Sequence, residues 1–405
     1  MAKELILLNI SGPDKPGLTS KMTEILSNHK AHILDIGQAV IHNFLNIGIL
    51  FEVNEEFNSS PILKDLLFKA YKLGIEVKFT AVSEEDYESW VSNQGKERYI
   101  VTLLGRYLTA EQISKLTSII SNQGLNIDII NRLSGRTSLV QKAEDKNVCV
   151  EFYVTGTPNN LQEMKKSFLE LSPLTGIDIA FQADNIFRRS RRMICFDMDS
   201  TLIQAEVIDE LAEYAGVREE VSRITEAAMR GEIDFKESFK QRLSLMKGVK
   251  ESVLLEIVSK IPLTQGAERL FKALKKFGFK TAILSGGFTY FARHLQAKLG
   301  IDYVYANELE IENGVLTGNY IGEVVDGKRK ADLLKVLADR ENLLLEQVVA
   351  VGDGSNDLPM ISVAGLGIAF HAKPVVKENA RTAISTIGLD GILYLMGYRD
   401  RDIEF

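Results

Sequence analysis

Three short apolar segments in the second half of the chain run directly into acidic or glycine-rich turns. They are Met193–Phe196, Lys280–Leu284 and Val348–Val351, and segments with helical patterns lie between them. This alternation of strand and helix predicts an α/β fold, a parallel sheet flanked by helices. In such an open sheet, ligands bind at the edge formed by the carboxyl ends of the strands. We therefore expect the residues that follow these segments to share one site.

The turn after the first segment brings two carboxylates together. Asp197 and Asp199 flank a single residue, and side chains alternate with a period of two along a strand, so both are expected on one side. Two carboxylates this close repel each other and need a cation or a proton to coexist. Magnesium, which prefers oxygen ligands, is the natural partner. The alternative is that the pair only caps the following segment.

The turn after the second segment is suited to bind phosphate. Ser285-Gly286-Gly287 precedes a helical stretch that contains Phe291 and Leu295. A hydroxyl, a closely approaching backbone and a helix N-terminus together form a phosphate cradle. The alternative is a tight turn without a ligand.

Two more features complete the set. Gly352-Asp353-Gly354-Ser355-Asn356-Asp357 follows the third segment and again delivers acids to the sheet edge, although alone it could be an Asx turn. Lys330 opens an apolar-periodic helix, and its neighbours Lys328 and Arg329 leave a solvated basic patch as the alternative.

In this order, the four features resemble the haloacid dehalogenase superfamily over residues 193 to about 399. Within it the chain is most similar to phosphoserine phosphatases, through the three turns and Phe370-His371-Ala372-Lys373-Pro374. The resemblance implies a Rossmann-like parallel sheet with a helical cap at about residues 206–262. It also implies the hydrolysis of O-phospho-L-serine to L-serine and phosphate, the last step of serine biosynthesis.

The resemblance implies roles for the acidic residues and one cation. Asp197 would be the nucleophile that forms an aspartyl-phosphate, and Asp199 the general acid and then the general base. Mg²⁺ would be held by the Asp197 carboxylate, the Asp199 carbonyl and Asp353, with Asp357 close to metal-bound water.

Substrate contacts follow from the same resemblance. Phosphoryl oxygens would be held by Ser285, Gly286 and Lys330, with Asn356 near the phosphate. Glu206 would bind the substrate ammonium and Arg242 its carboxylate, because a guanidinium can grip a carboxylate in bidentate fashion. The remaining supporting residues are Met229, Phe235 and Gly287.

The first half of the chain shows a βαββαβ order twice. The first copy starts with the apolar run at Leu5, and a similar order starts again at Tyr99. This half resembles two ferredoxin-like ACT domains in tandem, which sense amino acids. We expect domains at 1–84, 97–185 and 190–405, with a linker at 83–96.

The turn at Gly12-Pro13-Asp14-Lys15-Pro16-Gly17 carries much of the ACT resemblance, which implies that Gly12, Asp14 and Gly17 contact an amino-acid effector. A plain turn is the alternative. In the second copy, Gly105–Thr109 lacks the Asp and the second Gly, so a packing role is expected there. Four arginines near the next boundary predict a solvated hinge: Arg188, Arg189, Arg191 and Arg192.

Net charge and cysteine context limit the kinds of binding partner and the cell compartment to be expected. The net charge of −7 argues against nucleic acid and anionic membranes. Cys149 and Cys195 lie in apolar runs, which predicts buried free thiols and, with no signal segment at the start, a cytoplasmic enzyme. ACT-type modules commonly pair edge to edge, which implies a homodimer.

Two other functions stay open at this point. One is a phosphatase or phosphotransferase that acts on another small phosphorylated amino acid. The other is a catalytically silent amino-acid sensor built on the same fold, against which the intact acidic residues argue.

Overall fold

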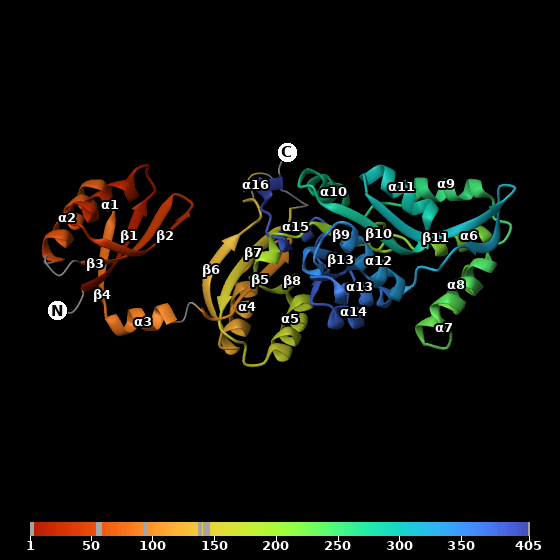
Figure 1. Ribbon diagram of the computed structural model, residues 1–405, viewed down its shortest axis with the longest axis horizontal. Coiled ribbons are helices and arrows are strands. Elements are labelled where there is room, and N and C mark those ends of the chain that lie inside the picture. The colour runs from red at the N-terminus through yellow and green to blue at the C-terminus, as the bar shows by residue number, and fades with distance from the viewer. Residues whose placement is uncertain (1–3, 54–58, 93–94, 137–139, 141–145, 404–405) are drawn as a thin grey trace. The chain divides into compact units, whose positions relative to one another are not determined.

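The computed structural model describes residues 4–53, 59–92, 95–136, 140 and 146–403 (Figure 1). The chain forms two units, Met1–Lys96 and Glu97–Phe405, which are described separately below. Within the described residues, no helix is long and apolar enough to cross a membrane.

The first unit is a four-stranded antiparallel sheet covered by two helices. Its elements are β1 (Glu4–Pro13), α1 (Leu18–Asn28), β2 (His32–Ile41), β3 (Phe44–Val53), α2 (Ser59–Leu73), β4 (Glu76–Val82) and α3 (Glu84–Ser92). The strand order is β2-β3-β1-β4. Leu8 and Ile49 of the sheet pack with Met22 and Leu66 of the helices in a buried core. The expected order is confirmed, and α3 occupies most of the segment expected to be a linker.

The second unit begins with the same arrangement. Its first elements are β5 (Arg98–Gly105), α4 (Ala110–Asn122), β6 (Asn126–Arg132), β7 (Val148–Thr155), α5 (Leu161–Thr175) and β8 (Ile177–Ala183). The strand order β6-β7-β5-β8 repeats that of the first unit, as the sequence predicted.

A larger α/β domain follows in the same unit. Its elements are η2 (Ile186–Arg188), β9 (Met193–Phe196), α6 (Val207–Ala215), α7 (Arg218–Met229), α8 (Phe235–Ser244), α9 (Glu251–Lys260), α10 (Ala267–Lys276), β10 (Lys280–Phe288), α11 (Thr289–Leu299), β11 (Tyr303–Glu312), β12 (Val315–Ile321), α12 (Gly327–Arg340), η3 (Leu345–Gln347), β13 (Val348–Gly352), η4 (Ser355–Asp357), α13 (Leu358–Val363), β14 (Leu366–Phe370), α14 (Pro374–Asn379), β15 (Thr382–Ile384), α15 (Gly391–Leu395) and α16 (Asp400–Ile403).

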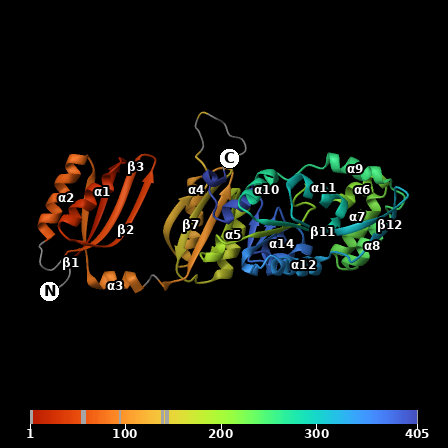
Figure 2. The ribbon, with the colours of Figure 1, turned by 45° about the horizontal axis from the view of Figure 1, so that its top comes forward.

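The sheet of this domain has seven strands in the order β12-β11-β10-β9-β13-β14-β15. All neighbours are parallel except β11 and β12. The three apolar segments of the sequence are the adjacent strands β10, β9 and β13, so their carboxyl ends lie side by side. Figures 1 and 2 show α6 to α9 grouped beside the β11–β12 hairpin, as a helical cap.

The second ACT-like sheet packs against the α/β domain through polar contacts. Asp178 on β8 accepts hydrogen bonds from Ser385 N at 2.9 Å, Thr386 N at 2.8 Å and Thr386 Oγ1 at 2.6 Å. Arg106, in the loop after β5, donates to Thr386 O at 3.2 Å and Gln265 Oε1 at 2.6 Å. The loop therefore has the packing role expected of it.

The prediction of a solvated hinge was wrong for two of the four arginines. Arg188 and Arg191 are buried, and Arg189 and Arg192 are exposed. Arg188 forms an ion pair with Glu151 of β7. The connection runs through the contact between the two domains, where a carboxylate from a distant strand allows Arg188 to be buried. Both cysteines are buried and free, as predicted.

Candidate active site

Asp197 and Asp199 follow β9 at the carboxyl edge of the central sheet. The Asp197 backbone N donates to Val351 O on β13 at 2.9 Å, which joins the first acidic turn to the third. Asp197 Oδ1 accepts a hydrogen bond from Met198 N at 2.7 Å, and Asp199 Oδ1 accepts one from Val207 N, at the start of the cap, at 3.3 Å. The pKa of Asp199 is raised well above its ordinary value by burial, and further by Glu206 and Asp197.

Lys330, in the first turn of α12, links two of the acidic turns. Its Nζ lies 2.9 Å from Asp197 Oδ2 and 2.6 Å from Asp357 Oδ1. The side chain is fully buried, which rules out the solvated basic patch. Burial alone would lower the pKa of Lys330, but the charges of Asp197 and Asp357 raise it above its ordinary value. The lysine is therefore a fixed cation between two carboxylates.

Three carboxylates converge beside this lysine. Asp197, Asp353 and Asp357 each offer an oxygen, and these oxygens lie within 4.8 Å of one another. Burial raises the pKa of Asp353 to about 7, and the charges of Asp197 and Glu206 add to the shift. Burial and Asp197 also raise the pKa of Asp357. Convergent carboxylates that are costly to ionise together are a suitable ligand set for a divalent cation that prefers oxygen. The Asp199 side chain is outside this group.

The loop after β10 lies against these acids. Ser285 is buried, and its Oγ accepts a hydrogen bond from Gly287 N at 2.9 Å. A Cβ on Gly287 would lie 2.5 Å from Asp199 Oδ2, so only glycine permits this approach. A Cβ on Gly286 would lie 3.1 Å from Cζ of Phe235, which shows that the cap reaches the loop.

Glu206 and Arg242 approach the site from the cap side. Glu206 precedes α6, and its Oε1 accepts a hydrogen bond from Ser200 Oγ at 2.8 Å. Burial raises the pKa of Glu206, and the charge of Asp197 raises it further. Arg242, in the last turn of α8, donates from Nε to Ser238 O at 3.4 Å. Burial lowers the pKa of Arg242, whereas Asp209, Glu206 and Asp199 oppose that shift.

The other expected residues are placed as follows. Asn356 and Asp357 lie in η4, and Gly354 N donates to Asp357 Oδ2 at 3.0 Å. Met229 ends α7, and its side chain lies outside the described part of the structure.

In the first unit, Gly17 has a φ of 85°, and a Cβ on Gly12 would lie 2.9 Å from Ile75 Cγ2. Backbone conformation and packing therefore explain the glycines at these two positions without a ligand. An effector role for Asp14 and its loop stays a prediction.

Sequence reasoning missed two buried polar residues of the site. Asn307, on β11, donates from Nδ2 to Gly286 O at 2.8 Å, and its Oδ1 accepts from Val325 N at 2.8 Å. Thr201 donates from Oγ1 to Asp353 Oδ1 at 3.2 Å. Thr201 could have been found, since it lies within the first acidic turn. Asn307 is marked in the sequence only as an amide residue within a segment whose pattern predicts a strand.

Comparison with known proteins shows which families the chain matches. The ACT domain family matches residues 4–80 and, in a second form, 98–182, and the haloacid dehalogenase-like hydrolase family matches residues 194–362. The chain is 37% identical to the phosphoserine phosphatase of Streptomyces coelicolor, over 98% of this chain and 93% of that protein. The chain belongs to the phosphoserine phosphatase family. The family member from Mycobacterium tuberculosis is 35% identical over 100% of this chain and 95% of its own length.

Two solved structures of related hydrolases are similar to this structure. The crystal structure of a probable phosphoserine phosphatase from Vibrio cholerae superposes with a TM-score of 0.58 at 35% identity, and covers 75% of this chain and 87% of that one. A haloacid dehalogenase family hydrolase from Salmonella enterica gives a TM-score of 0.64 at 31% identity, and covers 74% and 99%.

Proposed function

We propose that this phosphoserine phosphatase family member hydrolyses O-phospho-L-serine to L-serine and phosphate with Mg²⁺, the last step of serine biosynthesis. The observation that carries the proposal is the convergence of Asp197, Asp353 and Asp357 at the carboxyl ends of β9 and β13, where the buried Lys330 pairs with Asp197 and Asp357. The names of the full-length relatives support the choice of substrate.

Asp197 is the proposed nucleophile. A carboxylate oxygen attacks phosphorus in line, the bond from phosphorus to the serine oxygen breaks, and an aspartyl-phosphate forms. Asp197 suits this role because Lys330 and Met198 N hold both of its oxygens in fixed directions. Lys330, Ser285 and Gly286 N would bind the phosphoryl oxygens and offset their charge as the bond breaks.

Asp199 is the proposed proton carrier. Its raised pKa keeps a proton available for the departing serine oxygen. After the serine leaves, the Asp199 carboxylate accepts a proton from the water that attacks the aspartyl-phosphate, and Asp197 is released. Gly287 allows the Asp199 carboxyl to occupy this position, because it has no side chain that would displace it.

A divalent cation fits the acidic side of the site. We assign its ligands as the Asp197 carboxylate, the Asp199 carbonyl and Asp353, with Asp357 near its bound water. When bound, Mg²⁺ would offset the repulsion between the carboxylates and the phosphate and orient the phosphoryl group. Thr201 would keep Asp353 in place through its hydrogen bond.

The cap supplies the proposed recognition of the amino acid. Glu206 would bind the substrate ammonium and Arg242 its carboxylate, with Phe235 and Met229 as supporting residues and Asn356 near the substrate and its phosphate. Arg242 is partly buried, which strengthens its contact because water screens the charge less. Closure of α6 to α9 would exclude bulk water.

The ACT domains are the proposed site of regulation and assembly. We assign domains to residues 1–84, 97–185 and 190–405, with an amino-acid effector at Gly12, Asp14 and Gly17. The edge strand β2 has exposed apolar residues, Ile36 and Ile41 among them, which fit edge-to-edge pairing in a homodimer. The two buried free thiols fit the cytoplasm, where thiols stay reduced.

A phosphate-release assay tests the function. The full-length protein is incubated with L-phosphoserine, phosphothreonine and phosphohomoserine, with Mg²⁺ or with a chelator. The proposal predicts release from phosphoserine far above the others, and only with Mg²⁺. Preference for another phosphorylated amino acid would change the substrate, and no release from any of them would remove the enzymatic function.

A further inference from the structure

The phosphate-binding turn interrupts the pairing of two parallel strands. β10 pairs with β11 up to Leu284 and again at Phe288, which lies opposite Asn307. The residues between them, Ser285–Gly287, break the register of the two strands. Such an irregularity takes backbone groups out of the ladder of hydrogen bonds, and those groups then need other partners.

Asn307 supplies a partner to this turn. Its side chain is 2% exposed, and its Nδ2 donates to Gly286 O at 2.8 Å. The carbonyl of Gly286 and the N–H of Gly287 belong to one peptide group, and Gly287 N donates to Ser285 Oγ at 2.9 Å. Asn307 and Ser285 therefore hold both polar atoms of this peptide.

The orientation of this peptide decides where the Ser285 hydroxyl can donate. Because Ser285 Oγ accepts the hydrogen bond from Gly287 N, its own hydrogen remains available to a phosphoryl oxygen. A peptide between two glycines rotates easily, since glycine has the widest choice of backbone angles. Rotation would break the bond from Asn307 to Gly286 O and would turn a carbonyl toward Ser285. Asn307 thus opposes the rotation.

The other end of the same amide reaches the start of the helix that carries Lys330. Asn307 Oδ1 accepts a hydrogen bond from Val325 N at 2.8 Å. The next residue, Asp326, is the N-cap of α12, and its carbonyl accepts from Lys330 N at 2.9 Å. A Cβ on Gly286 would lie 3.6 Å from Val325 O, so the turn and the start of this helix are in contact. One buried side chain therefore joins them.

We propose that Asn307 is a positioning residue for phosphoryl transfer. It fixes the peptide between Gly286 and Gly287 in the orientation that phosphate binding needs, and it sets the distance from this peptide to Lys330. This role rests on the proposed function, in which Ser285, Gly286 N and Lys330 bind the phosphoryl oxygens. Donors held in fixed directions need no rearrangement as charge develops in the transition state.

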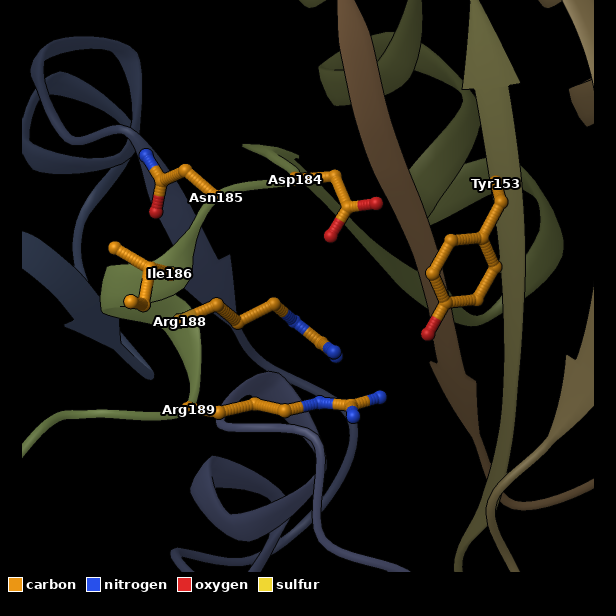
Figure 3. A pocket seen from close by; sticks show the side chains of 6 residues that line it. All are labelled: Tyr153, Asp184, Asn185, Ile186, Arg188 and Arg189. Atoms are coloured by element: carbon orange, nitrogen blue, oxygen red, sulfur yellow. The ribbon is translucent and has the colours of Figure 1, made fainter.

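Buried polar links also occur outside the candidate active site. Figure 3 shows the surroundings of one, beside a cavity of about 350 Å³, where Arg188 and Arg189 extend in parallel toward Tyr153. Arg188 is buried and forms an ion pair with Glu151, whereas Arg189 is exposed. This link includes none of the residues assigned to phosphoryl transfer. Its loss would remove a charge pair, so it is not matched to a neutral amide.

Gln112, on α4 of the second ACT-like domain, provides a closer control for Asn307. The side chain of Gln112 is likewise 2% exposed. Its Nε2 donates to Thr175 O at 2.9 Å, and its Oε1 accepts from Thr109 N at 2.8 Å. Truncation of either amide therefore takes a partner from one backbone carbonyl and one backbone N–H, at a similar cost in stability.

Phosphate binding and turnover of the full-length protein test the proposal. Wild type, Asn307→Ala and Gln112→Ala are titrated calorimetrically with inorganic phosphate in Mg²⁺ and assayed with phosphoserine and a neutral aryl phosphate. In Asn307→Ala, kcat should fall about 100-fold with both esters, the usual effect of a displacement of about 1 Å. Phosphate should bind about tenfold more weakly, because a hydrogen bond to a charged oxygen is lengthened. Gln112→Ala should change neither quantity.

The two assays separate failure of this role from failure of the proposed function. Wild-type phosphate affinity in Asn307→Ala would overturn the proposal, as would an equal loss in Gln112→Ala, which would indicate a general effect of destabilisation. If the wild type hydrolyses neither ester, the proposed function fails, and the phosphate titration alone decides the role of Asn307.

A second variant keeps the test decisive if Asn307→Ala does not fold. Asn307→Asp nearly preserves the shape of the side chain and the acceptor for Val325 N, but the ionised carboxylate has no proton to donate to Gly286 O. At about pH 8.5 this variant should bind phosphate more weakly than the wild type. At about pH 6 the ratio of the two affinities should return toward one, because a buried carboxyl readily gains a proton and can then donate. A ratio of one at both pH values would contradict the role of Asn307.

Discussion

A Cβ on Gly287 would lie 2.5 Å from Asp199 Oδ2, although the two residues come from different strands of the sheet. Asp199 follows β9, and Gly287 lies near the end of β10. The absence of a side chain at Gly287 therefore sets where the carboxyl of Asp199 can lie.

Gly287→Ala should displace Asp199 while leaving the fold intact. We expect kcat for phosphoserine to fall about 100-fold, the usual effect of a displacement of about 1 Å in a reacting group. Steady-state kinetics and circular dichroism measure the two quantities. The matched control is Gly95→Ala, an exposed position outside the left-handed region where a Cβ would meet no atom within 4 Å. Activity of Gly287→Ala equal to that of the control would show that Asp199 tolerates the shift.

Lys330→Met should destabilise the protein as well as inactivate it. The variant leaves Asp197 and Asp357 buried without their cation, and breaking such a pair costs about 3–5 kcal/mol. Urea unfolding in a chelator measures the loss, with the exposed neighbour Lys328→Met as the control. The double variant Lys330→Met, Asp357→Asn should recover part of the stability but no activity. An unchanged free energy of unfolding in Lys330→Met would contradict the ion pairs.

Arg242→Ala should raise KM for phosphoserine by tenfold or more, because a charged contact with the substrate carboxylate is lost. For a neutral aryl phosphate, which has no such carboxylate, the change in KM should be small. Arg230→Ala, on the same cap but exposed and paired with Glu232, should alter neither value. Equal effects of Arg242→Ala on both substrates would remove this residue from recognition.

Both cysteines should resist modification in the native protein. Burial raises the pKa of Cys195 to about 12 and that of Cys149 well above its ordinary value. The reactive thiolate is therefore scarce at pH 8, and neither sulfur is accessible. A thiol-specific dye should react only after denaturation. Rapid labelling of either cysteine in the native state would show that its region opens.

Local sequence patterns predicted the parts of the site that lie directly after apolar strands. Asp197, Ser285 and Asp353 follow such segments, and parallel pairing brings the strand ends together. The burial of Arg188 and Arg191 could not be predicted from local patterns. Whether a charged side chain can be buried depends on which partners the folded chain brings to it. Glu151 pairs with Arg188, whereas Arg191 finds only neutral acceptors. Asn307 was missed because its role depends on the Gly286 carbonyl, which reaches it only in the folded sheet.

The most direct test of the account is to trap the phosphorylated residue. The full-length enzyme is mixed with phosphoserine and Mg²⁺, quenched in acid during turnover and treated with borohydride, which reduces an acyl phosphate to an alcohol. Peptide mass spectrometry should then find homoserine in place of Asp197, and no such change in Asp199, Asp353 or Asp357. Reduction at another acidic residue, or full turnover with no reducible residue, would contradict Asp197 as the nucleophile.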